Sequence, residues 1–181
     1  FTGPSTKLFD VPKELMKYLS YCEGVRTPAY VPIFDLKDVD DAVKHLNFPL
    51  FVKPAHAGDS RGVDEHSLVH NKIELQQKCI SILEEYGQLL AEEYIQGREY
   101  TVLVAANADG HSCTAFRPVE YVFAKGREFK TYALKTSELH PECNFPCEDP
   151  ALDKKLRAAA EKIFKAFNGV GYGRMDFRVN D

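Results

Sequence analysis

The first chemical signal in this chain is a lysine that directly follows a short apolar run. Residues 50–52 predict a buried strand, because an unbroken apolar run bounded by prolines suits a strand covered on both faces. Lys53 stands at the end of this run, and since an unpaired buried ammonium is costly, it either reaches solvent or meets an anion. Gly58, Ser60 and Gly62 follow, and a loop of small residues can fold its N–H groups around phosphate oxygens. The stretch is therefore either a phosphate site or a solvated loop.

A second group of charged residues alternates along a predicted strand near the end of the sequence. In GYGRMDFRVND, Arg174, Asp176 and Arg178 are separated by apolar residues, so the three charges share one face. A guanidinium binds oxyanions, and a carboxylate binds a hard cation such as Mg²⁺. This face is built either for chemistry or for contact with water. Lys13 is a further candidate anion ligand or a solvated lysine, because it lies in the first turn of a predicted helix.

Histidines and cysteines allow a different interpretation. His140, Cys143 and Cys147 have a spacing close to that of zinc ligands, but no fourth ligand lies nearby, so a loop with reduced cysteines is favoured over zinc. His56 is interpreted as a solvated or hydrogen-bonded loop residue.

Helical and extended patterns supply the elements that must position these residues. Apolar spacing and capping residues predict helices at about 12–23, 38–46, 71–87 and 150–168. Alternation and turn residues predict strands or extended runs at 50–52, 88–95, 99–106, 112–116, 119–123 and 171–181. The segment 26–35 is expected to be an extended connector and 129–149 a loop, since both contain prolines. Met16, Phe164 and Phe167 are expected in the core.

Length and composition bound the class of protein. The 181 residues, 44% of them hydrophobic, suffice for one domain or two small lobes. A net charge of −4 and a pI near 5.9 give no overall attraction for nucleic acid or an anionic membrane, so any phosphate site must be local. Five scattered cysteines suit a reducing compartment and predict a cytoplasmic protein. No apolar run approaches the roughly 18 residues of a membrane span.

Three spaced segments have to be explained together, and together they resemble one family. The segments VKPAHAGDSRGV, LLAEEYIQGREYTV and GYGRMDFRVND, with FTG at the start, resemble the ATP-grasp superfamily and within it most of all the D-alanine:D-alanine ligases. The resemblance runs over nearly the whole chain. It implies an α+β fold in which two lobes with antiparallel sheets grip ATP. It also implies an ATP- and Mg²⁺-dependent ligase that joins small amino acids through an acyl phosphate.

The resemblance assigns residues to the nucleotide. Lys53 and the less closely matched Lys13 are similar to lysines that hold phosphates, and Ser60 belongs to the phosphate loop. Lys135 resembles a lysine that a mobile loop places over the terminal phosphates.

The segment EEYI resembles a hinge whose backbone pairs with adenine. By this resemblance Glu92 lies on the side of the exocyclic amine, Tyr94 and Ile95 line the ring, and Glu99 holds the ribose hydroxyls.

The closing strand resembles the part of the family site where the reaction takes place. Arg174 is similar to the arginine that stabilises charge on the transferred phosphoryl group, and Asp176 to a carboxylate ligand of Mg²⁺. Arg174 and Lys135 are thus the expected catalytic residues.

The sequence also departs from the family pattern. Ala57 stands where a glutamate is usual, Asp59 where a serine is usual, and Ala133 where the mobile loop carries an acid. The Glu-x-Asn pair that completes the magnesium site is expected after Asp181. These departures leave two alternatives to a D-alanine:D-alanine ligase: a non-catalytic nucleotide-binding module in an assembly, and an ATP-grasp peptide ligase for another amino acid.

The resemblance implies three parts in the chain. Residues 1–34 form an N-terminal helix and connector, 35–95 a first ATP-grasp lobe, and 96–181 a second lobe that is incomplete at its C-terminal end. Phe1 is expected to be an internal point of a longer polypeptide. The expected partners are amino acid substrates and either a second copy or the rest of a larger chain, with neither nucleic acid nor membrane.

Overall fold

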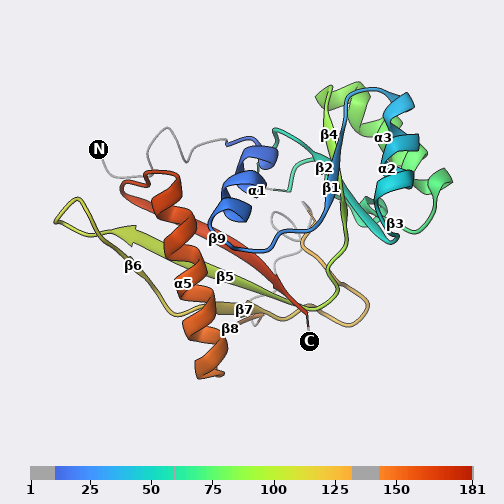
Figure 1. Ribbon diagram of the computed structural model, residues 1–181. Helices are drawn as coiled ribbons and strands as arrows, with labels where there is room; N and C mark the ends of the chain where they lie inside the picture. The colour runs from blue at the N-terminus through green and yellow to red at the C-terminus, as the bar shows by residue number, and fades with distance from the viewer. Residues whose placement is uncertain (1–10, 59, 132–142, 181) are drawn as a thin grey trace.

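Two antiparallel sheets make up the structure, a computed structural model that describes residues 11–58, 60–131 and 143–180 (Figure 1). The first sheet has the strand order β1-β4-β2-β3, and all its pairs are antiparallel. Its strands are β1 (Tyr30–Ile33), β2 (Leu50–Pro54), β3 (Leu68–Val69) and β4 (Leu89–Glu93). Helices α2 (Val39–His45) and α3 (Lys72–Tyr86) cover one face of this sheet, and short 3₁₀ turns lie at Leu36–Asp38 and Glu65–Ser67. The other face is left open to the second half of the chain.

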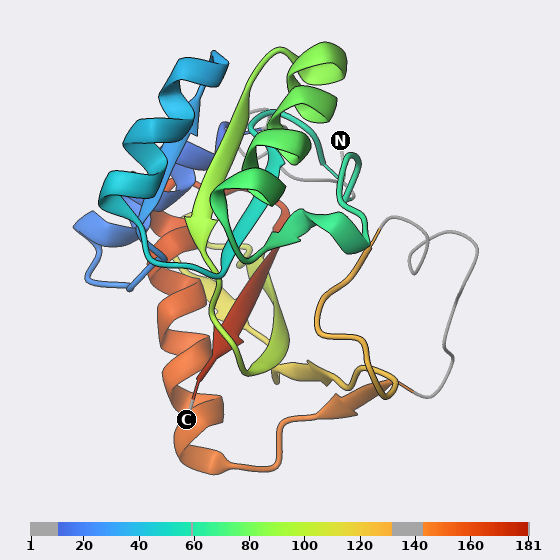
Figure 2. The same cartoon turned by 90° about the vertical axis from the view of Figure 1, so that its right-hand side faces the viewer.

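The second sheet is built on the long strand β5 (Arg98–Ala106). One edge of β5 pairs with β6 (Cys113–Ala115) and β7 (Val119–Tyr121), the other with β9 (Tyr172–Val179), and β8 (Asn144–Pro146) extends the sheet beyond β7. Helix α5 (Pro150–Ala166) lies along one face of this sheet (Figure 2). Tyr100, Val102 and Val104 of β5 are buried against α5, so the intervening residues of β5 point to the opposite face.

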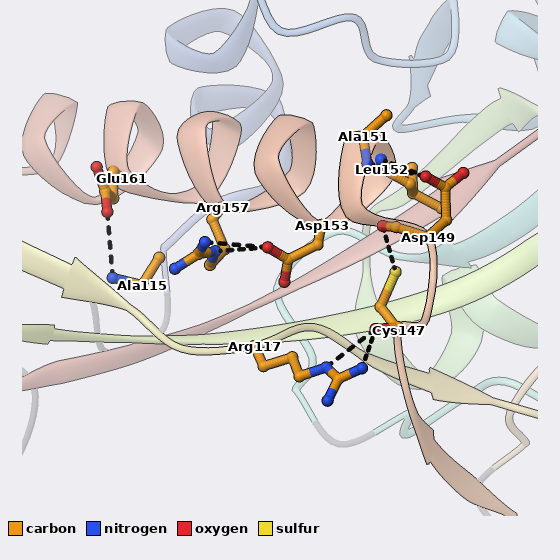
Figure 3. A network of polar contacts seen from close by, with 9 residues as sticks. All are labelled: Ala115, Arg117, Cys147, Asp149, Ala151, Leu152, Asp153, Arg157 and Glu161. Atoms are coloured by element: carbon orange, nitrogen blue, oxygen red, sulfur yellow. Dashed lines mark hydrogen bonds and ion pairs between the residues drawn. The ribbon is translucent and has the colours of Figure 1, made fainter.

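The ends of the two long helices are set by capping side chains and by a glycine with a positive φ. The side chain of Asn71 accepts a hydrogen bond from Glu74 N at 3.0 Å, and Gly87 ends α3 with a φ of 71°. Asp149 caps α5 by accepting from the N–H groups of Ala151 at 2.8 Å and Leu152 at 3.2 Å (Figure 3). The predicted capping residues of both helices are confirmed.

Helix α1 (Lys13–Cys22) connects the two halves of the molecule. It packs against α5, where Lys162 Nζ donates to Glu23 O at 3.3 Å, and its other contacts reach the open face of the first sheet (Figure 1). The expectation that Met16 belongs to the core is wrong, because Met16 is 39% exposed. The buried face of α1 carries Lys17 and Ser20 instead. This polar buried face is the first sign that α1 serves a site and not only a core.

The predicted α+β fold with antiparallel sheets is confirmed, with two corrections. The proline-bearing segment expected to be a connector forms the edge strand β1, since Pro32 lies opposite Leu90 in a regular antiparallel register. Residues 144–146, expected in a loop, form β8. Phe164 and Phe167 are buried as predicted. None of the helices in residues 11–58, 60–131 and 143–180 combines the length and the apolar character needed to span a bilayer.

Candidate functional site

The open face of the first sheet carries Lys53 and Glu92. Strand register pairs Phe51 with Glu92 and Lys53 with Leu90, so these four side chains share a face. The opposite face belongs to the core beneath α2 and α3. Lys53 is therefore at the end of its strand, as predicted, and it points away from that core toward α1.

Glu92 is a buried carboxylate held between two ammonium groups. Lys53 Nζ pairs with Oε1 of Glu92, and Lys17 Nζ lies 2.6 Å from Oε2. Burial favours the neutral acid, but the charges of Lys53 and Lys17 outweigh it and hold the pKa of Glu92 below its ordinary value. Both carboxylate oxygens are engaged in this way, so the exocyclic amine of an adenine would have to compete with two lysines for this side chain.

Lys13 ties the start of α1 to the loop that follows Lys53. Its Nζ donates to Ala57 O at 2.7 Å and to Ala55 O at 3.3 Å. The predicted phosphate lysines thus lie on neighbouring segments, and α1 is what brings them together.

Backbone conformation in the loop after Lys53 explains its small residues. Ser60 has a φ of 58°, and Gly62 has a φ of 73°. A Cβ on Gly62 would meet Pro54 Cγ at 2.5 Å, so this glycine is needed for close approach to the strand end. Gly58 has open space around it. The loop is consistent with a phosphate cradle, and the roles of Ser60 and its neighbours stay predictions.

Aromatic rings and backbone bonds shape the segment between the sheets. Tyr94 N donates to Pro49 O at 3.0 Å, which continues the first sheet to the hinge. The ring of Phe51 lies 6.3 Å from that of Tyr94 and 4.9 Å from that of Phe129, which comes from the chain after β7. Sequence reasoning missed Phe129, because no periodic pattern marks it. These rings bring the two halves of the molecule into contact beside the predicted adenine hinge.

The other predicted residues share one face of the second sheet. Register places Glu99 opposite Arg178, Thr101 opposite Asp176, and Leu103 opposite Arg174, all on the face away from α5. Thr101 Oγ1 donates to Asp176 Oδ1 at 2.6 Å, and Arg174 Nε lies 3.6 Å from the same oxygen. The predicted common face of the three charges on β9 is confirmed.

Arg178 has a positioning role that the sequence did not reveal. Its guanidinium donates to Ile95 O at 3.1 Å, to Tyr94 Oη at 2.6 Å and to Glu128 O at 2.8 Å. It also pairs with Glu99 at 3.5 Å. This one side chain therefore fixes the hinge to β9, and the alternation of charges on β9 was the only sequence signal for it.

Glu99, the predicted ribose ligand, has a second cationic neighbour. Lys130 Nζ lies 2.8 Å from Glu99 Oε1 and 4.2 Å from the centre of the Tyr121 ring. Ribose hydroxyls would share this carboxylate with Lys130 and Arg178, which hold it in place.

The donor set on the second sheet fits a Mg²⁺ ion that is held mainly by phosphates. Mg²⁺ commonly takes one or two carboxylates together with substrate phosphate oxygens, and Asp176 is a half-exposed carboxylate on the open face. Within residues 11–58, 60–131 and 143–180, no three His, Cys, Asp or Glu side chains gather into a metal cluster. Lys135 and His140 lie outside the described residues, so neither the loop lysine nor the zinc spacing is placed.

A cavity of about 390 Å³ lies elsewhere, beside the start of α5. Its two arginines are already engaged: Arg117 donates to Cys147 O at 2.7 and 3.0 Å, and Arg157 pairs with Asp153 at 3.0 Å (Figure 3). It lies on the α5 side of the sheet, whereas the predicted ligands lie on the opposite face. We therefore do not assign the site to this cavity.

Sequence comparison places the chain among known proteins. A family profile described as "D-ala D-ala ligase C-terminus" matches residues 24–181. A D-alanine–D-alanine ligase from Acetivibrio thermocellus is 34% identical over 143 residues, which cover 78% of this chain and 36% of that protein. One from Lactococcus lactis is 32% identical over 172 residues, which cover 92% and 47%. The chain thus spans about half or less of the length of these relatives.

Solved structures with the same arrangement of elements belong to related proteins. The VanG D-Ala:D-Ser ligase from Enterococcus faecalis superposes with a TM-score of 0.74 at 23% identity, covering 92% of this chain and 48% of that one, which shows a shared fold. A D-alanine–D-alanine ligase from Bacillus anthracis, solved with ATP, has a TM-score of 0.69 at 25% identity, covering 94% and 50%.

Proposed function

This chain belongs to the D-alanine–D-alanine ligase family, with the ATP-grasp fold, and on that premise we propose that it provides the nucleotide-binding part of an ATP-dependent carboxylate–amine ligase. The substrates proposed are small amino acids of the D-alanine class. The observation that carries the proposal is the pair of open sheet faces that meet at the hinge. One presents Lys53, the other Asp176 and Arg174, and the ring contact of Phe51 with Phe129 joins the two halves.

Each half of the proposed site has its own task. Lys53 and Lys13 would bind phosphate oxygens, and the Tyr94–Ile95 backbone with the ring of Phe51 would hold adenine. When bound, ATP would supply the phosphoryl group that activates the substrate carboxylate as an acyl phosphate, and Mg²⁺ would offset the negative charge of its phosphates.

On the second sheet, Asp176 would hold the cation, with Thr101 fixing the orientation of its carboxylate through the 2.6 Å hydrogen bond. Arg174 would stabilise negative charge on the transferred group, because its guanidinium lies beside Asp176 on the same face. Glu99, held in place by its ion pairs with Lys130 and Arg178, would accept hydrogen bonds from the ribose.

Two alternatives keep specific support. A non-catalytic nucleotide-binding module is favoured by the engagement of Glu92 and Glu99 in ion pairs and by the single carboxylate on the open face of β9. A ligase for another amino acid is favoured by Ala57 and Asp59 in the phosphate loop. ATP hydrolysis that requires both a carboxylate and an amine supports a ligase, and a panel of D- and L-amino acids then separates D-alanine from other substrates. Binding of Mg²⁺ATP without such turnover supports the module.

Replacing Lys53 tests the position of the phosphates. We expect Lys53→Ala to weaken Mg²⁺ATP binding at least about tenfold, because an ammonium–phosphate contact is lost. Isothermal titration calorimetry measures the affinity. Lys162→Ala is the control, since this exposed lysine donates to Glu23 O at the end of α1 and lies outside the proposed site. Equal affinities of Lys53→Ala and the unsubstituted chain would show that the phosphates bind elsewhere.

The cellular location, the division into lobes and the assembly of the protein are also proposals. A reducing, cytoplasmic location is supported by the absence of any disulfide bond among the cysteines of the described residues, Cys22, Cys79, Cys113, Cys143 and Cys147. Division into lobes at 35–95 and 96–181 is supported by the two separate hydrophobic cores, whereas the boundary of the N-terminal part (1–34) is not, because β1 pairs with β4 and Ile33 lies in the first core. Assembly as a homodimer or within a larger polypeptide is the remaining proposal, which light scattering on the purified protein tests.

A further inference from the structure

We propose that Lys17 is a positioning residue that keeps the buried carboxylate of Glu92 neutralised when Lys53 leaves it to bind the phosphates of a nucleotide. The inference rests on the proposed function, because it gives Lys17 a task within the same nucleotide site. It follows from the burial of Glu92, from the unequal attachment of the two lysines, and from the competition between Glu92 and phosphate for Lys53.

The carboxylate of Glu92 cannot be left without a counter-charge. Its side chain is 10% exposed, and among the described residues Oε2 has no hydrogen-bonding partner other than the ammonium of Lys17 at 2.6 Å. Breaking a buried ion pair by removing one partner is strongly destabilising, since the remaining charge is neither hydrated nor compensated. Any event that draws Lys53 away from Oε1 therefore depends on what holds Oε2.

The two lysines differ in how firmly they are held. Lys17 is 10% exposed in its side chain, donates to Pro28 O at 3.3 Å, and lies 5.2 Å from the centre of the Tyr30 ring. The Lys53 side chain is 22% exposed, and besides Glu92 its Nζ lies only near the ring of Phe51 on its own strand, 5.9 Å from the ring centre, with no backbone carbonyl among its described partners. Lys53 is thus the lysine that is free to turn toward a ligand, whereas Lys17 is fixed beside Glu92.

Charge balance before and after binding supports an exchange of partners. Without nucleotide, one carboxylate faces two ammonium groups, which leaves an excess positive charge in the cluster. When Lys53 turns to a phosphate, Glu92 and Lys17 remain as a neutral pair. Without Lys17, the same movement would leave Glu92 as an isolated buried anion, so phosphate binding would be opposed.

A double-mutant cycle with two ligands tests the proposal. ADP and adenosine are titrated into the unsubstituted chain, Lys17→Met, Glu92→Gln and the double variant by calorimetry. We expect Lys17→Met to weaken ADP binding about tenfold or more while adenosine affinity changes by less than about twofold, because only a phosphate draws Lys53 away. In the Glu92→Gln background, Lys17→Met should change ADP affinity by less than about twofold, since no buried anion remains. Lys17→Arg keeps the charge and should restore much of the lost ADP affinity.

Each remaining outcome decides the question. Equal loss of ADP affinity in both backgrounds means that Lys17 contacts phosphate itself, and it overturns the inference. An unchanged ADP affinity in Lys17→Met does the same. If Lys17→Met does not fold by circular dichroism, the comparison of Glu92→Gln with the double variant decides alone. If the unsubstituted chain binds neither ligand, the proposed function fails and the inference fails with it, whereas normal binding without the coupling overturns the inference only. Lys162→Met, the matched control, should leave both affinities unchanged.

Discussion

At the scale of single residues, the site depends on charges that hold one another in place before any ligand arrives. Lys13 is bonded to loop carbonyls, Lys53 to Glu92, and Glu99 to Lys130. Sequence reasoning identified Lys13, Lys53 and Glu99, but not Lys17. The spacing of Lys13 and Lys17, four residues apart on one helix face, was the available signal, and only the structure shows that this face is buried against the sheet.

Protonation of Glu92 should destabilise the fold at acidic pH. Its pKa in the folded state is lowered from 4.5, so its ion pairs contribute full stability above pH 4.5, and that contribution is lost as the pH falls through the lowered value. Glu92→Gln should reduce the free energy of unfolding by roughly 1–3 kcal/mol at neutral pH. It should also flatten the dependence on pH below 4.5. Urea unfolding of both proteins between pH 7 and the acid limit, about pH 2.5, measures this. Parallel curves for the two proteins would exclude Glu92 as the titrating group.

At the scale of elements, caps and close approaches decide where helices and strands end. The Asp149 cap, the helix stop at Gly87 and the alternating charges of β9 are local features, so the sequence predicted α3, α5 and β9 well. Strands β1 and β8 are edge strands that form only by pairing with segments elsewhere in the chain. The sequence did not predict them, because both segments contain prolines and have the composition of connectors or loops. Local sequence signals determine where a helix or strand ends, whereas pairing with distant segments determines whether a segment forms a strand at all.

The start of α5 offers a prediction at this scale. Asp149→Ala removes two hydrogen bonds to the first turn, and we expect it to lower the free energy of unfolding by about 1 kcal/mol. Asp153→Ala is the control in the same turn, because it removes an ion pair with the half-exposed Arg157 and no hydrogen bond to the backbone, and it should cost about 0.5 kcal/mol or less. Chemical denaturation of both variants provides the comparison. Equal losses would mean that the cap contributes no more than a surface ion pair.

At the scale of the whole molecule, three connections join the sheets: α1 with its lysines, the hinge at Tyr94–Gly97, and the contacts of Arg178 and Phe129. The sequence predicted the α+β fold with antiparallel sheets through a family resemblance, and the ligand roles of its candidate residues stay predictions. It did not predict Arg178 or Phe129 as connecting residues, because their contacts join segments at least 50 residues apart, and no periodicity encodes such contacts. The positions of Lys53 and Asp176 were predictable, and the network that holds them was not.

Gly97 tests how tightly the hinge is joined to the second sheet. It has a φ of 146°, and an added Cβ would lie 2.1 Å from Val179 O. Gly110 has a φ of 69° with nothing within 4 Å, so it isolates the cost of the backbone conformation alone. We expect Gly110→Ala to cost about 1 kcal/mol and Gly97→Ala at least about 1 kcal/mol more, because strand β9 must also move. Thermal unfolding measures the loss of stability in both variants. Equal losses would show that the close approach of Gly97 to β9 adds nothing to the cost of the backbone conformation.

The pairing of β5 with β9 has a consequence for how the protein forms. The central strand of the second sheet follows the four strands of the first sheet in the chain, but its longest partner, Tyr172–Val179, comes last among the described strands. Until that strand emerges, β5 has one bare edge, and the face with Thr101 lacks Asp176 opposite it. A nascent chain can therefore complete the first sheet well before the second, because closing a loop of that length delays non-local pairing. The proposed ligand face thus matures after the first sheet, and a ribosome-bound chain stopped before Tyr172 should show a protected first sheet beside an unprotected β5.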